Sequence, residues 1–203
     1  MFSALTPITK NLIILNVVVF VLANLIFPPM YDYLVAYFPL SPNFKSWQII
    51  THMFMHAGIM HIAFNMIALA SFGPVLERVL QGRKYVILYF LSGFGALLLH
   101  SLWLYYQMIS TQEIIDSRML GASGAIFGVM AGFTALYPNA EMFIMFIPFP
   151  IKAKILLPIV IIGSLYFGIT GGGGNVAHFA HIGGAIVGYL LVKFWGRNRY
   201  RIY

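Results

Sequence analysis

The sequence predicts an all-α integral membrane protein, a bundle of six transmembrane helices. The first observation is composition, because 61% of the 203 residues are hydrophobic and only 8% are charged, whereas a soluble domain has about a quarter charged residues. The second is a mean hydropathy of +0.87. The third is a set of apolar runs, each near the length of about 20 residues that a helix needs to cross a bilayer. They are approximately residues 10–28, 48–74, 83–105, 119–137, 152–170 and 176–195.

The first run could be mistaken for a secretory signal peptide. Its apolar stretch from Asn11 to Phe27 is too long for the hydrophobic region of such a peptide, and no small-x-small cleavage site is evident. We therefore expect it to be retained as the first helix. No stretch remains for a soluble domain, so residues 1–203 are predicted to form a single membrane domain. The absence of cysteine excludes disulfides and thiolate chemistry.

Basic residues gather in the loops that one orientation would place in the cytoplasm. With both termini cytoplasmic, ten of the twelve basic residues lie inside and only Lys45 and Arg118 lie outside, as the positive-inside rule favours. The inside set is Lys10, Arg78, Arg83, Lys84, Lys152, Lys154, Lys193, Arg197, Arg199 and Arg201. The net charge of +7 is therefore explained by topology, with anionic lipid contact as a secondary effect, and no nucleic-acid partner is expected.

The second run contains the stretch THMFMHAGIMHIAFNM, with His52, His56, His61 and Asn65. His61 and Asn65 are four residues apart and share a helix face. Three histidines in ten residues suggest zinc, but the segment has no carboxylate, HExxH is absent, and His56 and His61 are five apart. We expect no metal. For His52 and His56 the favoured interpretation is structural: hydrogen bonds that tie the first external loop to the bundle.

The fourth run begins MLGASGAIFGVMAG and has Gly124, Gly128 and Gly132 at intervals of four. Three glycines on one face let another helix approach closely. Packing alone would explain this face, since such patterns occur in membrane helices of every function. Ser123 could likewise be an ordinary small residue bonded back to its own helix.

Lateral access to the interior of the bundle would pass either the second or the fifth run. The fifth run has Pro158 and only bulky apolar faces, so we expect it to be loosely attached and to be the element that moves. The glycine run at 171–174 before the sixth helix is either a flexible cap over a site or a plain surface loop.

The sixth run, VAHFAHIGGAIVGYL, places His181, Gly184, Ala185 and Gly188 on one face. An ionisable side chain inside a membrane segment suggests a functional site, because its burial in lipid is costly. Counted from the outside, Ser123 and His181 lie at comparable shallow depth. Two glycine-lined helices would bring the hydroxyl and the imidazole together, and serine nucleophilic catalysis requires that pairing. His61 and Asn65 could then hold the oxyanion of a tetrahedral intermediate.

Three motifs, GASG at 121–124, AHIGG at 180–184 and HIAFN at 61–65, resemble those of the rhomboid family of intramembrane serine proteases, as does the pair Glu77-Arg78. The resemblance covers essentially the whole chain, as the basic six-helix prokaryotic form. It implies Ser123 as nucleophile and His181 as general base and acid. It also implies an oxyanion hole of His61, Asn65 and the Ser123 backbone amide.

The family pattern selects His181 over His178, which is three residues away and would lie at the cavity rim. Supporting positions implied by the resemblance are Phe127, Gly121, Gly124, His56 and His178. Two departures are visible. Gln48 stands where many members have arginine after tryptophan, so the arginine's anchoring contacts must be either replaced or absent, and a looser first loop is expected. Phe127 stands where tyrosine is frequent, and it can still stack on the His181 ring.

None of the acidic residues is placed to orient His181, so a Ser–His dyad and a slow enzyme are expected. Hydrolysis needs water, which the hydrocarbon core lacks. We therefore predict a cavity open to the outer face, lined by His56, His61, Asn65, His178 and His181. The substrates would be single-pass or multi-pass membrane proteins, cut near the outer ends of helices weakened by glycine or proline. The predicted location is a prokaryotic cytoplasmic membrane, and no cofactor is expected.

Other functions fit the sequence less well. A catalytically inactive relative that binds membrane clients usually lacks the serine or the histidine, and this chain keeps both. A transporter or channel would place charged residues through the core and show inverted repeats, and neither is evident. An aspartyl intramembrane protease would need a GxGD motif to accompany Asp32, and that motif is missing.

Overall fold

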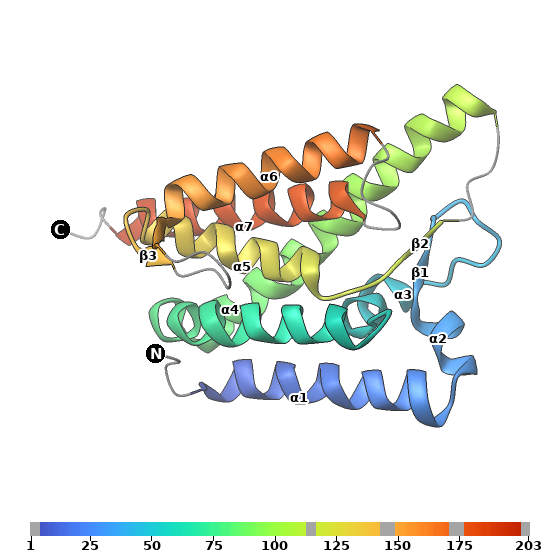
Figure 1. The fold of residues 1–203 in the computed structure, drawn as a ribbon, viewed down its shortest axis with the longest axis horizontal. Helices are drawn as coiled ribbons and strands as arrows, with labels where there is room; N and C mark the ends of the chain where they lie inside the picture. The colour runs from blue at the N-terminus through green and yellow to red at the C-terminus, as the bar shows by residue number, and fades with distance from the viewer. Residues whose placement is uncertain (1–4, 113–116, 143–148, 171–176, 200–203) are drawn as a thin grey trace.

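The computed structural model describes residues 5–112, 117–142, 149–170 and 177–199, most of them in helices (Figure 1). In chain order the elements are α1 (Pro7–Val21), a π-helical turn (Leu22–Ile26), α2 (Pro29–Leu34), β1 (Ala36–Tyr37), α3 (Gln48–Thr51), a 3₁₀ turn (His52–Phe54), α4 (Ile59–Thr111), β2 (Arg118–Met119), α5 (Ser123–Leu136), β3 (Glu141–Met142), β4 (Ile151–Lys152), α6 (Ala153–Thr170) and α7 (His178–Arg199). The segments Pro7–Ile26, α4, α6 and His178–Gly196 are long and apolar enough to cross a membrane, and α5 is a shorter apolar helix.

The longest helix, α4, is broken at Gln81, where φ is 63° and ψ is 159°. This residue reverses the chain, so that α4 forms a first arm (residues 59–80) and a second arm (residues 82–111), seen in teal and in green in Figure 1. The two arms correspond to the second and third helices that the sequence predicts. The second arm reaches Thr111, beyond its expected end at 105.

The expectation that the second helix begins at 48 is wrong, because the first arm begins at Ile59. Residues 48–54 form α3 and the 3₁₀ turn, and the chain is extended at Met55, where ψ is 144°. The apolar side chains Met53, Phe54 and Met55 are buried inside the protein. Hydropathy alone cannot distinguish a residue buried in protein from one buried in lipid, and this explains the error.

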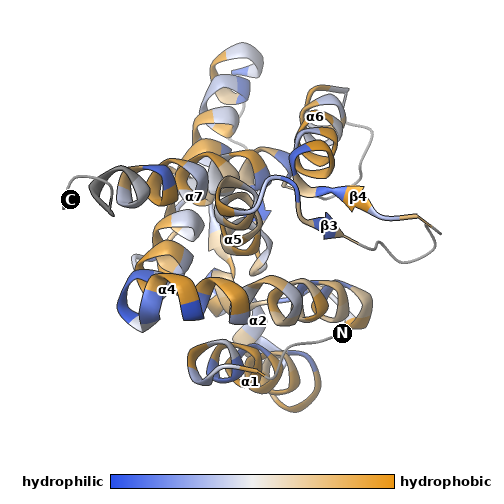
Figure 2. Ribbon diagram, turned by 90° about the vertical axis from the view of Figure 1, so that its left-hand side faces the viewer, coloured by the Kyte–Doolittle hydropathy of each residue, from blue (hydrophilic) through white to orange (hydrophobic). Residues whose placement is uncertain are grey.

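Close backbone packing places α5 at the centre of the bundle, between α4, α6 and α7 (Figure 2). A Cβ built on Gly184 of α7 would collide with the backbone oxygen of Gly124, and one on Gly188 with that of Gly128. A Cβ on Gly124 would in turn collide with the Ala96 methyl group of the second arm. The predicted glycine-lined contact between α5 and α7 is therefore confirmed.

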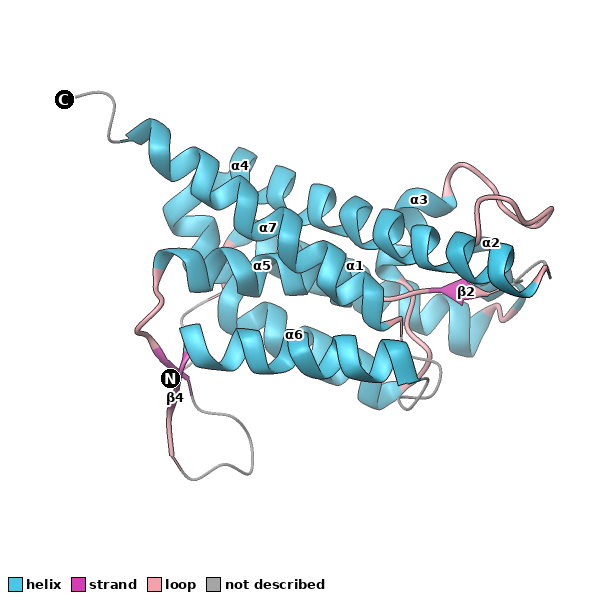
Figure 3. Ribbon diagram, turned by 90° about the horizontal axis from the view of Figure 1, so that it is seen from above, coloured by secondary structure: helices cyan, strands magenta, loops and turns pink. Residues whose placement is uncertain are grey.

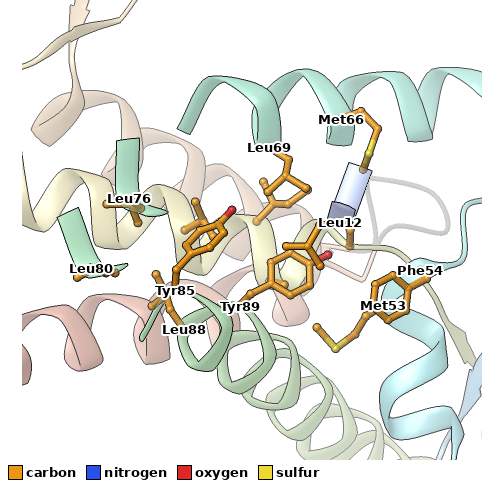
Figure 4. Close-up of a cluster of buried hydrophobic side chains, with 14 of the residues drawn as sticks. Leu12, Met53, Phe54, Met66, Leu69, Leu76, Leu80, Tyr85, Leu88 and Tyr89 are labelled. Atoms are coloured by element: carbon orange, nitrogen blue, oxygen red, sulfur yellow. The ribbon is translucent and has the colours of Figure 1, made fainter. Parts of the chain in front are cut away.

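A large apolar cluster joins α1, the 3₁₀ turn, both arms of α4, α5 and α7 (Figure 4). Its most deeply buried side chains include Leu69, Leu76, Tyr85, Leu88 and Tyr89. They come from both arms, so the reversal at Gln81 folds the first arm against the second. Outward-facing positions of the same helices carry exposed apolar side chains, as expected for surfaces that face lipid. Figure 2 shows that hydrophobic residues, in orange, recur along the helices.

The bundle is not purely helical, since two short antiparallel ladders occur (Figure 3). One pairs Ala36 with Met119 and Tyr37 with Arg118, and the other joins β3 to β4. The first ladder attaches the loop after α1 to the segment before α5. Arg118 strengthens this attachment by donating a 2.6 Å hydrogen bond to Asp32 Oδ1. The fourth predicted helix therefore begins at Ser123 rather than at 119.

Glu77 of the first arm caps the N-terminus of α1 from outside that helix. Its carboxylate accepts hydrogen bonds from the backbone N–H of Ile8 at 3.0 Å and of Thr9 at 2.8 Å. It also accepts from the hydroxyl groups of Thr6 and Thr9. The backbone N–H groups of a first helical turn have no hydrogen-bond partner within the helix, and the negative charge of the carboxylate is favourable at a helix N-terminus.

We expect Glu77→Gln to lower the free energy of unfolding by about 2 kcal/mol, since hydrogen bonds to a charged group contribute roughly 1.5–3 kcal/mol. The amide turns one acceptor oxygen into a donor that faces other donors. The measurement is the unfolding temperature in detergent, with Glu141→Gln on the exposed strand β3 as the matched control. Equal unfolding temperatures for the two variants would contradict the capping role.

Candidate active site

Ser123 and His181 meet near the N-terminal ends of α5 and α7. His181 Nε2 lies 3.0 Å from Ser123 Oγ, at hydrogen-bond distance. Ser123 is the first residue of α5, and His181 lies in the first turn of α7. The glycine contacts deeper in the same two helices bring the backbones together. This places a weak nucleophile beside a base that can remove its proton.

The His181 ring is held by stacking on Phe127, one turn along α5 from Ser123. The ring centroids are 4.3 Å apart and the planes differ by 3°, so the expected stacking is confirmed. Among the described residues that line the surrounding cavity, none is Asp or Glu. Asp32 pairs with Arg118 and Glu77 caps α1, while Glu113 and Asp116 fall outside the described residues.

His61, from the first arm of α4, lines the same cavity as Ser123 and His181. A Cβ built on Gly121 would lie 3.1 Å from His61 Nε2 and 3.6 Å from Ser123 Oγ, so the two atoms flank one small space. Gly121 has φ of +117°, a conformation that favours glycine. The Ala57 N–H donates to His61 Nδ1 at 3.4 Å. This assigns the proton to Nε2 and makes that atom a donor toward the space.

Asn65 lies one turn after His61 and also lines the cavity. Its Nδ2 donates to the His61 carbonyl oxygen at 3.1 Å. The amide nitrogen carries two hydrogens, so one remains for a group bound in the cavity. His61, Asn65 and the N-terminus of α5 thus supply N–H donors near Ser123.

The cavity has a volume of about 970 Å³ and contains Ser123, His181, His61 and Asn65 in its walls. Residues of the second arm line it as well, and the sequence analysis missed them: His100, Trp103, Leu104 and Gln107. A single signal could have identified one of them, because His100 is an ionisable residue within an apolar run. Among the described residues, no group of His, Asp or Glu side chains is arranged to hold a metal ion.

His56 and His178 do not line this cavity, so the expectation for them is wrong. The His56 ring is fully buried behind His61, edge-on to it at 5.1 Å between centroids. Burial, together with the neighbouring His61, lowers the pKa of His56 to about 4, so His56 is neutral at physiological pH. His178 packs between Phe167 and the edge of the His181 ring. The predicted cap at 171–174 lies outside the described residues.

The first loop is attached to the bundle through backbone atoms rather than through histidine rings. The His52 carbonyl oxygen accepts from the Gly121 N–H at 2.9 Å, and the His56 carbonyl oxygen accepts from Asn24 Nδ2 at 3.4 Å. The His52 ring instead bonds within its own loop, with Nδ1 2.6 Å from the Gln48 carbonyl oxygen.

Gln48 is buried and holds this loop together, so of the two expected alternatives the structure shows that anchoring contacts are replaced rather than absent. Its Oε1 accepts from the backbone N–H of Lys45 at 3.0 Å and of Tyr37 at 3.4 Å. Its Nε2 donates to the carbonyl oxygens of Asn43 at 3.4 Å and Tyr33 at 3.5 Å. The glutamine amide thus links three parts of the loop.

Fold and site together define a class of protein, a multi-pass helical membrane protein with a serine hydroxyl beside an imidazole in a cavity between its helices. The family model for the Rhomboid domain matches residues 43–198. The chain therefore belongs to the rhomboid family.

Relatives in this family come from several organisms. "Rhomboid protein 1, mitochondrial" of Saccharomyces cerevisiae is 32% identical over 190 residues, which cover 89% of this chain and 52% of the relative. "Rhomboid protease AarA" of Providencia stuartii is 32% identical over 162 residues, which cover 76% of this chain and 57% of the relative. "Rhomboid protease GluP" of Bacillus subtilis is 31% identical over 152 residues, which cover 74% of this chain and 26% of the relative. The chain thus spans little more than half of the length of these relatives, or less.

Proposed function

We propose that this chain is an intramembrane serine endopeptidase that uses a Ser123–His181 dyad. The observation that carries the proposal is the 3.0 Å separation of Ser123 Oγ from His181 Nε2 inside a cavity that could admit a peptide segment. The names of two related proteins as proteases add support.

In the proposed mechanism, Ser123 Oγ attacks the carbonyl carbon of the scissile bond while His181 Nε2 takes the hydroxyl proton. The tetrahedral intermediate collapses when His181 returns that proton to the leaving amine, and an ester forms on Ser123. Water then attacks the ester, with His181 again serving as base and then as acid. Phe127 holds the imidazole plane in place of the acidic side chain of a triad.

The developing oxyanion would be held by His61 Nε2, the Asn65 amide and the Ser123 backbone N–H. The position of Gly121 supports this assignment, because the space beside it lies between His61 Nε2 and Ser123 Oγ. Donors that are fixed before the reaction stabilise the charge that develops in the transition state.

We further propose six membrane crossings in a single membrane domain, with α1, the two arms of α4, α5, α6 and α7 as the spans. Both termini would be cytoplasmic, as the distribution of basic residues favours, and the cavity would open to the extracytoplasmic side of the cell membrane. The substrates would be membrane proteins whose helices unwind easily near that surface. No nucleic acid or cofactor takes part in this proposal.

The test is cleavage of a transmembrane model substrate by the purified protein in detergent. His181→Ala is expected to lower turnover by at least about 10³-fold, since the serine then lacks its base. His178→Ala, the matched control three residues away, is expected to keep most of the turnover. The reverse pattern would give the base role to His178, and substrate binding without cleavage by the wild type would indicate an inactive client-binding protein.

For the oxyanion donors, we expect His61→Ala and Asn65→Ala each to lower turnover by about 10²-fold, the effect of losing one such donor. The loss should appear in kcat more than in KM, because the charge exists only in the transition state. Steady-state kinetics on one substrate measures both parameters. An unchanged kcat in both variants would show that backbone amides suffice.

A further inference from the structure

One wall of the cavity is formed by a single face of the second arm of α4. Its four lining residues, His100, Trp103, Leu104 and Gln107, follow helical spacing on one face. The arm is held against both catalytic helices, since Ala96 contacts Gly124 and Leu99 contacts Gly183. Trp103 fixes the wall further by stacking on Phe179 of α7, with centroids 4.3 Å apart.

His100 lies four residues after Ala96, so it continues the face that contacts α5 into the cavity. Its side chain is 8% exposed. Both ring nitrogens are buried without a hydrogen-bond partner among the residues that the structure describes. The nearby His52 ring is already bonded to the Gln48 carbonyl oxygen. A buried imidazole without a partner is unfavourable, so its partner should come from what occupies the cavity.

The surroundings limit the chemistry of that occupant. Leu104, Phe127 and Ala180 are apolar members of the cavity lining, and no acidic side chain lines the described cavity. The basic lining residue Arg118 is already paired with Asp32. A neutral imidazole offers one N–H donor and one nitrogen acceptor. The imidazole can therefore form hydrogen bonds with a neutral side chain that also donates and accepts, such as a hydroxyl group. It cannot form a hydrogen bond with an alkyl side chain of similar shape.

We propose that His100 is a specificity-determining residue, which hydrogen-bonds a hydroxyl-bearing substrate side chain next to the scissile bond. This inference rests on the proposed protease function. Serine or threonine at a flanking position would satisfy the imidazole, whereas alanine or valine would leave it unpaired, and a buried polar group left unpaired by a ligand lowers its affinity.

The test uses the purified protein and substrates that differ at one residue on either side of the scissile bond, in the pairs Ser/Ala and Thr/Val. The wild type is expected to show a kcat/KM about fivefold to tenfold higher for the hydroxyl-bearing member at one flanking position, the net effect of one neutral hydrogen bond. His100→Leu is expected to bring that ratio to about one. His100→Gln, which keeps a donor and an acceptor, should retain part of the preference.

Tyr105→Leu, on the exposed side of the same arm, is the control and should keep the wild-type ratio. The inference is overturned if the wild type shows no such preference at either position, or if His100→Leu cleaves with the preference intact. The wild-type ratio and the glutamine variant decide the matter even where the leucine variant does not fold. Absence of cleavage of every substrate would overturn the protease function itself, a result distinct from cleavage without preference.

Discussion

Ser123→Ala is expected to abolish proteolysis, lowering turnover by at least about 10⁴-fold, as loss of a serine nucleophile does in other hydrolases. The methyl group cannot attack a carbonyl, and His181 then has no hydroxyl to deprotonate. A fluorophosphonate probe measures the same property without a substrate, because it reacts covalently with an activated serine. Labelling of the wild-type protein should be lost in the variant.

The control for this prediction is Ser110→Ala, which removes an exposed hydroxyl whose bond, 2.9 Å long, goes to the Tyr106 carbonyl oxygen of its own helix. That variant should label and cleave as the wild type does. Labelling that persists after Ser123→Ala would place the nucleophile elsewhere in the chain.

Gly184→Ala is expected to disrupt both stability and activity. The added Cβ would meet the backbone of Gly124, with the carbonyl carbon 2.7 Å away, and a neighbouring backbone cannot move aside as a side chain can. We expect the free energy of unfolding to fall by about 3 kcal/mol, at the upper end of overpacking in a close-packed interior. The helices must separate to accept the methyl group, so Ser123 and His181 should lose contact and turnover should fall with stability.

Gly163→Ala on α6 is the matched control, since no atom lies within 4 Å of a Cβ built there. Its unfolding temperature should be unchanged or slightly higher, because alanine is a better helix former than glycine by about 1 kcal/mol. Equal unfolding temperatures for Gly184→Ala and Gly163→Ala would show that the two catalytic helices are not held by backbone contact.

Much of the site could be predicted because its determinants are local in sequence. The spacing of four residues between Gly124 and Gly128 predicts that both lie on one face of a helix, where another helix can approach closely. The matching face of α7 carries Gly184 and Gly188. Two such faces have few other ways to pack. The position of a hydroxyl beside an imidazole then follows from their depth along the helices.

The features of the fold and the site that the sequence did not predict depend on contacts between segments far apart in the chain. Residues 48–58 contain apolar side chains that adjoin the second membrane run, yet Met53 and Met55 are buried against the protein, and no local pattern distinguishes such burial from burial in lipid. Glu77 finds its partners at Thr6 and Thr9, about 70 positions away. His100 became visible as a cavity residue only when the rotation of the second arm about its axis was known.

The contact of main chain with main chain between α5 and α7 has a consequence for how relatives can diverge. At Gly124 and Gly184 no side chain stands between the helices, so no substitution there can adjust the separation of Ser123 from His181 by small steps. That spacing is inherited as a whole or lost as a whole. If the proposed protease function holds, diversity in substrate choice is expected to arise on the other cavity walls, where one residue can be exchanged at a time.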